Sequence, residues 1–146
     1  MKNKLLTLFF VVTFFLLSAP SASAVTNGVV KVGLRYGSSA LASANLENAE
    51  GAGYEFGYYD GDRRFVALGQ TDVTTITMSP SGGSAVTVTR TGTSEVLYEH
   101  FARDYPLGVR PFGTITWFKG CRYAGGFEYV PESVGSLRVI NVVDLE

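Results

Sequence analysis

The chain has 146 residues, of which 46% are hydrophobic, and it carries 12 basic and 13 acidic side chains for a formal net charge of −1. This length fits one domain with a single core. The small negative charge excludes a basic nucleic-acid-binding protein, and it gives no broad attraction to anionic lipids or wall polymers.

The first 24 residues have the three parts of a secretory signal peptide. Lys2 and Lys4 give a charged start, an apolar run extends over residues 5–17, and the segment 22–24 (Ala-Ser-Ala) has the small residues of a cleavage site. The run is shorter than the roughly 20 residues that a membrane-spanning helix needs. We therefore expect cleavage after Ala24 and a secreted, extracytoplasmic mature chain. An uncleaved signal anchor is the alternative.

The mature chain is predicted to consist of short β-strands. From Val30 to Tyr36, apolar residues alternate with polar residues or glycine, and this period of two is typical of a half-buried strand. Further runs are rich in β-branched and aromatic residues, which favour strands. The expected strands, in chain order, are 30–36, 54–59, 64–68, 73–78, 85–90, 95–101, 114–118, 122–130 and 137–145.

Turns and loops separate these strands. Residues 60–62 (Asp-Gly-Asp), 79–84 (SPSGGS) and 131–135 are predicted turns, the first two of them closing hairpins. Residues 40–53 are predicted to be a loop, with at most one helical turn. Residues 102–113, which contain two prolines and two glycines, are predicted to be a connecting loop. The expected fold is mainly β, a small single domain of short antiparallel strands and hairpins after a signal peptide.

Two single residues could suggest chemistry. Cys121 is the one cysteine, so it cannot form an internal disulfide. We expect it to be a small buried residue in a strand; an intermolecular disulfide or a metal ligand is the alternative. His100 is the one histidine, and zinc usually needs three or four protein ligands. The sequence predicts no metal site and no cofactor.

The C-terminal segment resembles a known family. Residues 117–146 are similar to the opening of the catalytic domain in the stage II sporulation protein D family, which includes the amidase enhancers of bacterial cell-wall lysis. The resemblance is carried by 122–123 (Arg-Tyr), by 125–128 (Gly-Gly-Phe-Glu) and most specifically by 137–146 (LRVINVVDLE). Residues 30–60 also look like the N-terminal part of exported members.

The resemblance implies work on peptidoglycan. Sporulation members are lytic transglycosylases, in which one Glu serves as acid and then base, and enhancer members stimulate wall amidases. In the family pattern the Leu-Glu pair is followed by Asp-Tyr and later by the catalytic Glu ahead of Met. This sequence ends at Glu146, which matches the Leu-Glu position. No catalytic residue is carried over, and this chain is not expected to be an enzyme as it stands.

The domain organisation follows from this comparison. Residues 1–24 are the signal peptide, 25–113 an N-terminal β-rich region and 114–146 the incomplete start of a sporulation protein D-like domain. The apolar strand 137–145 is expected to pair with a neighbouring strand on each side. If the protein ended after this strand, the strand would form an unprotected edge of the sheet. We infer a fragment of a longer protein. A short protein whose last strand pairs at the sheet edge or across a dimer is the alternative.

Aromatic side chains are the candidates for glycan binding, because a sugar ring presents an apolar face to an aromatic ring. Core or cross-strand packing is the alternative for each of them. The candidates are Tyr58, Tyr59, Trp117, Tyr123 and Phe127.

Three hypotheses for function result. The chain is the non-catalytic N-terminal portion of an exported wall-remodelling protein, or a free-standing β module that binds peptidoglycan strands or a cell-wall amidase. The third hypothesis is a short enzyme that uses another carboxylate, with Glu128 as the leading candidate.

Overall fold

The computed structural model describes residues 28–132 and 135–145, which form twelve strands and one short 3₁₀ helix. The predicted signal peptide at 1–24 lies outside the described residues. The elements in chain order are β1 (Gly28–Arg35), η1 (Gly37–Ser39), β2 (Ala44–Glu47), β3 (Tyr54–Tyr59), β4 (Phe65–Thr71), β5 (Thr75–Pro80), β6 (Ala85–Arg90), β7 (Val96–Phe101), β8 (Leu107–Pro111), β9 (Ile115–Phe118), β10 (Cys121–Ala124), β11 (Gly126–Glu132) and β12 (Ser136–Leu145).

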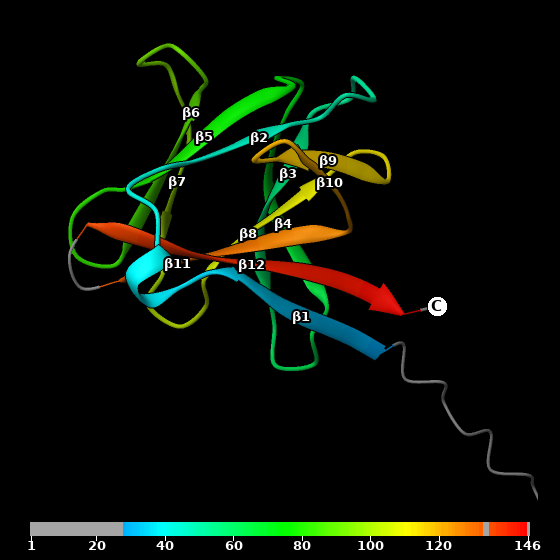
Figure 1. Ribbon diagram of the computed structural model, residues 1–146, viewed down its shortest axis with the longest axis horizontal. Helices are drawn as coiled ribbons and strands as arrows, with labels where there is room; N and C mark the ends of the chain where they lie inside the picture. Colours follow the sequence, from blue (N-terminus) through cyan, green and yellow to red (C-terminus); the bar gives the residue numbers. More distant parts are fainter. Residues whose placement is uncertain (1–27, 133–134, 146) are drawn as a thin grey trace, which may run out of the picture.

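The strands form two six-stranded antiparallel sheets (Figure 1). The first sheet has the order β1-β12-β11-β8-β3-β4 and the second has the order β10-β9-β2-β5-β6-β7. One face of each sheet is lined by buried apolar side chains, and these two faces enclose one core. The prediction of a small, mainly β domain is confirmed. The largest core side chains are Tyr54, Phe56, Phe127, Tyr129, Leu107 and Leu137 from the first sheet and Leu46, Ile76, Met78 and Phe118 from the second.

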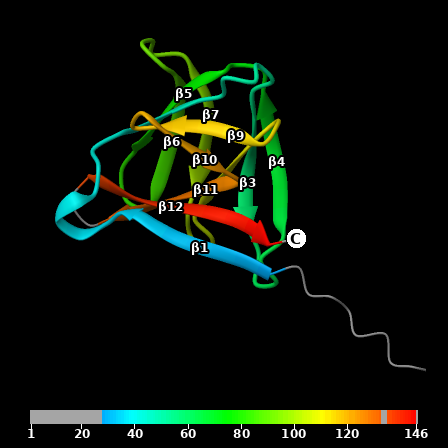
Figure 2. The same ribbon diagram turned by 45° about the vertical axis from the view of Figure 1, so that its right-hand side comes forward.

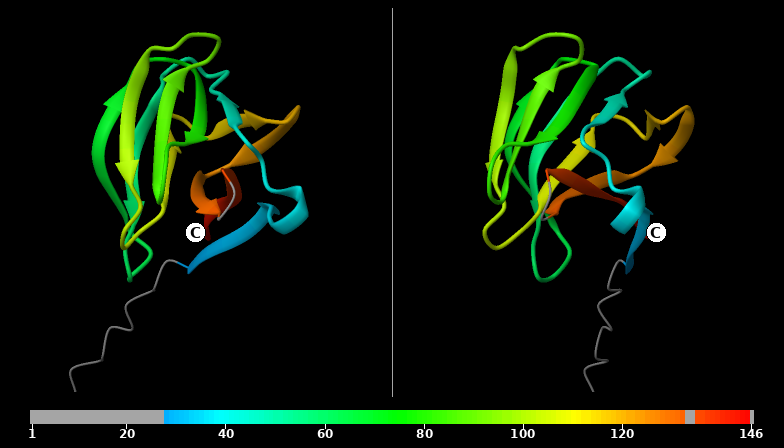
Figure 3. Two further views of the ribbon diagram at one scale, coloured as in Figure 1. Left: turned by 90° about the vertical axis from the view of Figure 1, so that its left-hand side faces the viewer. Right: turned by 60° about the vertical axis from the view of Figure 1, so that its left-hand side comes forward.

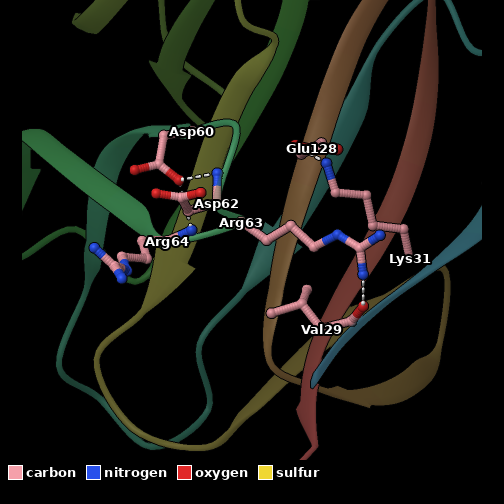
Figure 4. A network of polar contacts seen from close by, with 7 residues as sticks. All are labelled: Val29, Lys31, Asp60, Asp62, Arg63, Arg64 and Glu128. Carbon is pink, nitrogen blue, oxygen red and sulfur yellow. Dashed lines mark hydrogen bonds and ion pairs between the residues drawn. The ribbon is translucent and has the colours of Figure 1, made fainter. Parts of the chain in front are cut away.

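The predicted hairpins are present. β3 pairs with β4 across the Asp60 turn, and β5 pairs with β6. The Asp60 carboxylate holds its turn together, because one oxygen accepts hydrogen bonds from the backbone N–H groups of Asp62 and Arg64, each at 2.9 Å (Figure 4). A side-chain oxygen that bonds the backbone two residues on is the reason Asp is favoured at such turns.

Two strands lie where the sequence predicted loops. β2 falls inside the predicted loop 40–53, and β8 falls inside the predicted connecting loop 102–113. β2 lies between β9 and β5, and β8 lies between β11 and β3, so neither is peripheral. Both are short, and both acquire their extended form from partners far away in the sequence.

The predicted strand 122–130 is in fact two strands that belong to different sheets. β10 pairs with β9 in the second sheet, and β11 pairs with β12 and β8 in the first. The chain changes sheets at Gly125, whose φ of 77° lies in the left-handed region that favours glycine. The Asn141 side-chain amide fixes this crossing, because it donates to the carbonyls of Ala124 at 3.0 Å and Gly126 at 2.9 Å.

The last strand is not an edge of the sheet. β12 has β1 on one side and β11 on the other (Figure 2), so the expectation that 137–145 leaves an unprotected edge is wrong. On this side of the sheet the edge strand is β1, which carries Lys31, Arg35 and a register irregularity before Arg35, features that disfavour edge-to-edge pairing. Residue 114 is the predicted start of the last region of the chain. Strands that precede it in the sequence pair with strands that follow it, as β2 does with β9 and β1 with β12.

The outer face of the first sheet contains a buried carboxylate with a lysine partner. The Glu128 side chain is 2% exposed, and Lys31 on β1 reaches across β12 to bind it at 2.7 Å (Figure 4). The Lys31 ammonium also lies 5.8 Å from the ring centre of Tyr59. The guanidinium of Arg63, in the β3–β4 turn, donates to the carbonyl of Val29 at 3.1 Å. These contacts tie the edge strand β1 to the middle and far side of its own sheet. The backbone of the β3–β4 turn lies near the start of β1 (Figure 3).

Three buried tyrosines should make the fold sensitive to alkali. Burial raises the pKa of Tyr54, Tyr59 and Tyr129 well above the ordinary phenol value near 10. The unfolded chain therefore loses these protons at a lower pH than the folded chain does. The contribution of these buried phenol groups to the free energy of unfolding is fully present below about pH 10 and is lost as the pH rises further.

We therefore expect phenolate absorbance from these tyrosines to rise together with loss of the β-sheet circular dichroism signal above pH 10. Ionisation of all eight tyrosines near pH 10 with an unchanged circular dichroism spectrum would contradict the burial.

Candidate functional site

The outer face of the second sheet is polar and open. On β5, Ile76 and Met78 point into the core, and the alternate residues Thr75 and Thr77 are half-buried on the outside. β6 repeats the pattern, with outward-facing hydroxyl residues between buried valines. The register pairs these residues across the two strands, since Thr77 lies opposite Thr89. The result is a sheet face rich in threonine hydroxyl and methyl groups.

One row of side chains crosses this face and contains an aromatic residue, Trp117. Trp117 on β9 lies opposite Arg122 on β10 and opposite Glu47 on β2. Glu47 lies opposite Thr75, and the backbone N–H of Thr91 donates to the Thr75 carbonyl at 3.1 Å. Adjacent strands are about 4.8 Å apart, so this row extends roughly 19 Å across the strands. Strands β10, β9 and β2, which lie side by side in Figure 1, position its first three members.

A shallow pocket of about 240 Å³ lies beside Trp117. This is less than the roughly 300–1,000 Å³ of pockets that enclose drug-sized ligands, so the pocket fits one small ring with the rest of a ligand outside it. The hydroxyls of Thr77 and Thr91 lie 3.0 Å apart next to it. The lining residues are Asn45, Leu46, Glu47, Thr75, Thr91, Trp117, Lys119 and Gly120.

The charges at this pocket differ between its two sides. The Arg122 guanidinium carbon lies 5.8 Å from the ring centre of Trp117, within cation–π distance. Lys119 lines the pocket from the β9–β10 turn, and Glu47 lines it from β2. Trp117 therefore has Arg122 on one neighbouring strand and Glu47 on the other, with Lys119 in the turn that follows β9.

Of the five aromatic candidates, Trp117 is the one that lines this pocket. Tyr58 is half-buried and stacks on Tyr105 with ring centres 4.7 Å apart. Tyr59 is 5% exposed and lies on the other sheet, in edge-to-face contact with Phe65. These two rings contribute to packing at places remote from the row.

The remaining two candidates belong to the interior. Phe127 is fully buried and packs in the core against Phe118, with ring centres 6.0 Å apart. Tyr123 is half-buried and meets Phe127 edge-on at 5.8 Å. Their aromatic faces are used by other protein side chains.

The two residues singled out for metal or redox chemistry lie apart. Cys121 is exposed, so the prediction that it is buried is wrong; it begins β10, an edge strand at the margin of the sandwich. His100 is 7% exposed, and its Nε2 lies 2.9 Å from the carbonyl oxygen of Tyr105. Among the described residues no group of three or more His, Cys, Asp or Glu side chains could hold a metal ion.

Glu128 has a structural partner. Its carboxylate is buried on the outer face of the first sheet and is bound by Lys31, and it lies on a different sheet from the Trp117 row. No helix in the described part of the chain is long and apolar enough to cross a membrane.

Sequence reasoning missed the polar half of this site. Asn45 and Glu47 lie on β2, which was predicted to be part of a loop, so their common face could not be inferred. The alternation of threonine in residues 73–78 and 85–90 did signal one polar sheet face. Its position next to Trp117 depends on the pairing of β2 with β9.

A scan against protein-family models, a search of curated proteins and a search of solved structures each find no match to this chain. The geometry of the site therefore carries the functional argument.

Proposed function

We propose that this chain is an exported, non-catalytic β-sandwich that binds the glycan strands of peptidoglycan through the outer face of its second sheet. The predicted signal peptide supports export, and the resemblance of residues 117–146 to wall-remodelling proteins supports the wall as its location. Either as part of a longer protein or alone, the module would attach to the wall and leave bond cleavage to a partner such as an amidase.

One observation carries this proposal: Trp117 stands on an open sheet face, beside a pocket lined by hydroxyl, amide and charged groups. The C–H face of a sugar ring gains from contact with an indole ring, which offers a large apolar surface. The sugar hydroxyls and acetamido groups need hydrogen-bond partners at the same time, because desolvated polar groups without partners are costly. Asn45, Thr75 and Thr91 supply such partners next to the ring.

The same surroundings support binding rather than cleavage by one carboxylate or by two. A single catalytic Glu needs a buried setting to hold its proton, whereas Glu47 is exposed. Glycoside hydrolysis generally uses two carboxyl groups about 5 to 10 Å apart on either side of the scissile bond. Of the eight described residues that line the pocket, one, Glu47, carries a carboxylate. The buried Glu128 forms an ion pair with Lys31, and both residues lie on the first sheet, whereas the pocket is on the second.

Replacing Trp117 with alanine should strongly reduce retention of the protein on insoluble peptidoglycan. We expect affinity to fall about tenfold or more, since loss of a central tryptophan typically costs over 1.4 kcal/mol of binding free energy. The measurement is co-sedimentation with purified peptidoglycan over a range of protein concentrations. The circular dichroism spectrum should stay unchanged, because Trp117 is on the outer face.

Phe101→Ala is the matched control. Phe101 is an exposed aromatic residue in the same sheet, on the edge strand β7, four strands away from β9. This variant should bind like the unmodified protein. Equal loss in both variants would indicate nonspecific adhesion through exposed aromatic residues and would contradict the proposal, as would release of anhydro-muropeptides by the purified chain.

A further inference from the structure

The turn between β9 and β10 holds a lysine in an unusual conformation. Lys119 has φ of 51° and Gly120 has φ of 77°, so both central residues of this two-residue hairpin turn are left-handed. Asn, Asp and Gly are the residues that such turns favour, because other side chains crowd the backbone there. Folding alone would therefore favour another residue at position 119.

The position of this lysine suggests what its side chain does. Lys119 lines the pocket beside Trp117, and Arg122 lies over the same indole ring. Among the described residues no carboxylate lies within ion-pair distance of either cation. By contrast, Arg110 is bound to Glu55 at 2.6 Å. Two cations without a carboxylate partner thus stand at one end of the candidate site, in a chain with a net charge of −1.

We propose that the glycan bound at Trp117 is acidic, and that Lys119 and Arg122 bind a carboxylate on the sugar that stacks on the ring or on its neighbour. This inference rests on the proposed function and specifies its ligand. A carboxylate matches the fork of the Arg guanidinium, and charge-assisted hydrogen bonds are stronger than those between neutral groups.

Glu47 gives the site a direction. It lies opposite Trp117 on the β2 side, and Arg122 lies opposite Trp117 on the β10 side. A ligand whose carboxylate faced Glu47 would meet a like charge, which is a common way to reject a wrong orientation. The acidic group is therefore directed to the β9–β10 hairpin.

Two kinds of sugar carry such a carboxylate, a hexuronic acid and an amino sugar with a lactyl ether whose carboxyl group has no peptide attached. The test compares three soluble oligosaccharides of equal length by calorimetry at low and high salt. One is a neutral oligomer of N-acetylglucosamine, one is a peptide-free peptidoglycan strand and one contains glucuronate. The acidic oligomers should bind about tenfold more tightly than the neutral one in low salt, and this preference should shrink as salt screens the exposed charges. Which acidic oligomer binds more tightly identifies the source.

Lys119→Gly gives the sharpest variant, because it removes the cation and suits the turn. Its thermal midpoint should rise, while the ratio of acidic to neutral affinity should fall toward one. Arg103→Gln removes an exposed charge from the loop before β8 and should leave that ratio unchanged. Equal affinity of the unmodified protein for neutral and acidic oligomers would overturn this inference and leave the proposed function standing. Binding of none of the three would overturn both.

Discussion

Replacing Gly57 with alanine is expected to lower the free energy of unfolding by about 3 kcal/mol or more, which places this change among the most damaging single substitutions. Gly57 lies in the middle of β3 at a register irregularity opposite β4, and a Cβ there would overlap the carbonyl oxygen of Val66. Backbone cannot rotate away as a flexible side chain can. Relief would require β3 and β4 to separate, and the core residues Tyr54 and Phe56 are on β3.

Gly61→Ala is the matched control for this experiment. Gly61 is in the turn of the same hairpin, and a Cβ there meets nothing within 4 Å. Its stability should be unchanged or raised by about 0.4–1 kcal/mol through a less flexible unfolded chain. Urea denaturation of both variants measures the difference. Equal midpoints for Gly57→Ala and the unmodified protein would show that β3 and β4 do not approach as described.

Lys31→Met is expected to cost about 1–3 kcal/mol of stability, because it leaves the buried Glu128 carboxylate without its cation. Loss of a fully buried partner would cost more, but the Lys31 side chain is 39% exposed and water partly compensates. The effect should be measured by thermal and urea denaturation at neutral pH.

A second variant separates lost charge pairing from lost packing. In Lys31→Met combined with Glu128→Gln, the buried carboxylate is neutral, so most of the stability should return. If the double variant were no more stable than Lys31→Met alone, the ion pair would not be what holds β1 to the sheet.

The parts of the fold that local sequence determines were predictable. The β3–β4 and β5–β6 hairpins have strong turn residues between β-branched or aromatic runs, as at Asp60-Gly61. β2 and β8 were not predictable, because β2 consists of Ala-Asn-Leu-Glu, of low strand propensity, and β8 is bounded by Pro106 and Pro111. Only pairing with distant strands makes these segments extended.

The candidate site was likewise predictable in part from local sequence, and the rest depends on how distant strands pair. Trp117 was predicted as a glycan contact from its residue type, and the structure places it at the pocket. The other four aromatic candidates could not be sorted by sequence, because a ring in a strand can face the core or the outside and Gly125 changes the sheet to which the chain belongs. Lys119 went unnoticed because a turn lysine is ordinarily only a solvated charge.

The fluorescence of Trp117 offers the most direct measurement of the central proposal, that glycan strands bind on this sheet face. Trp117 is the single tryptophan of the chain, so its emission reports on this site alone. Titration with soluble, peptide-free peptidoglycan strands should give a saturable change in emission intensity and wavelength, because a stacked sugar displaces water from the indole. An unchanged emission spectrum, with strands shown to bind the protein by calorimetry, would place the binding surface elsewhere and contradict the proposal.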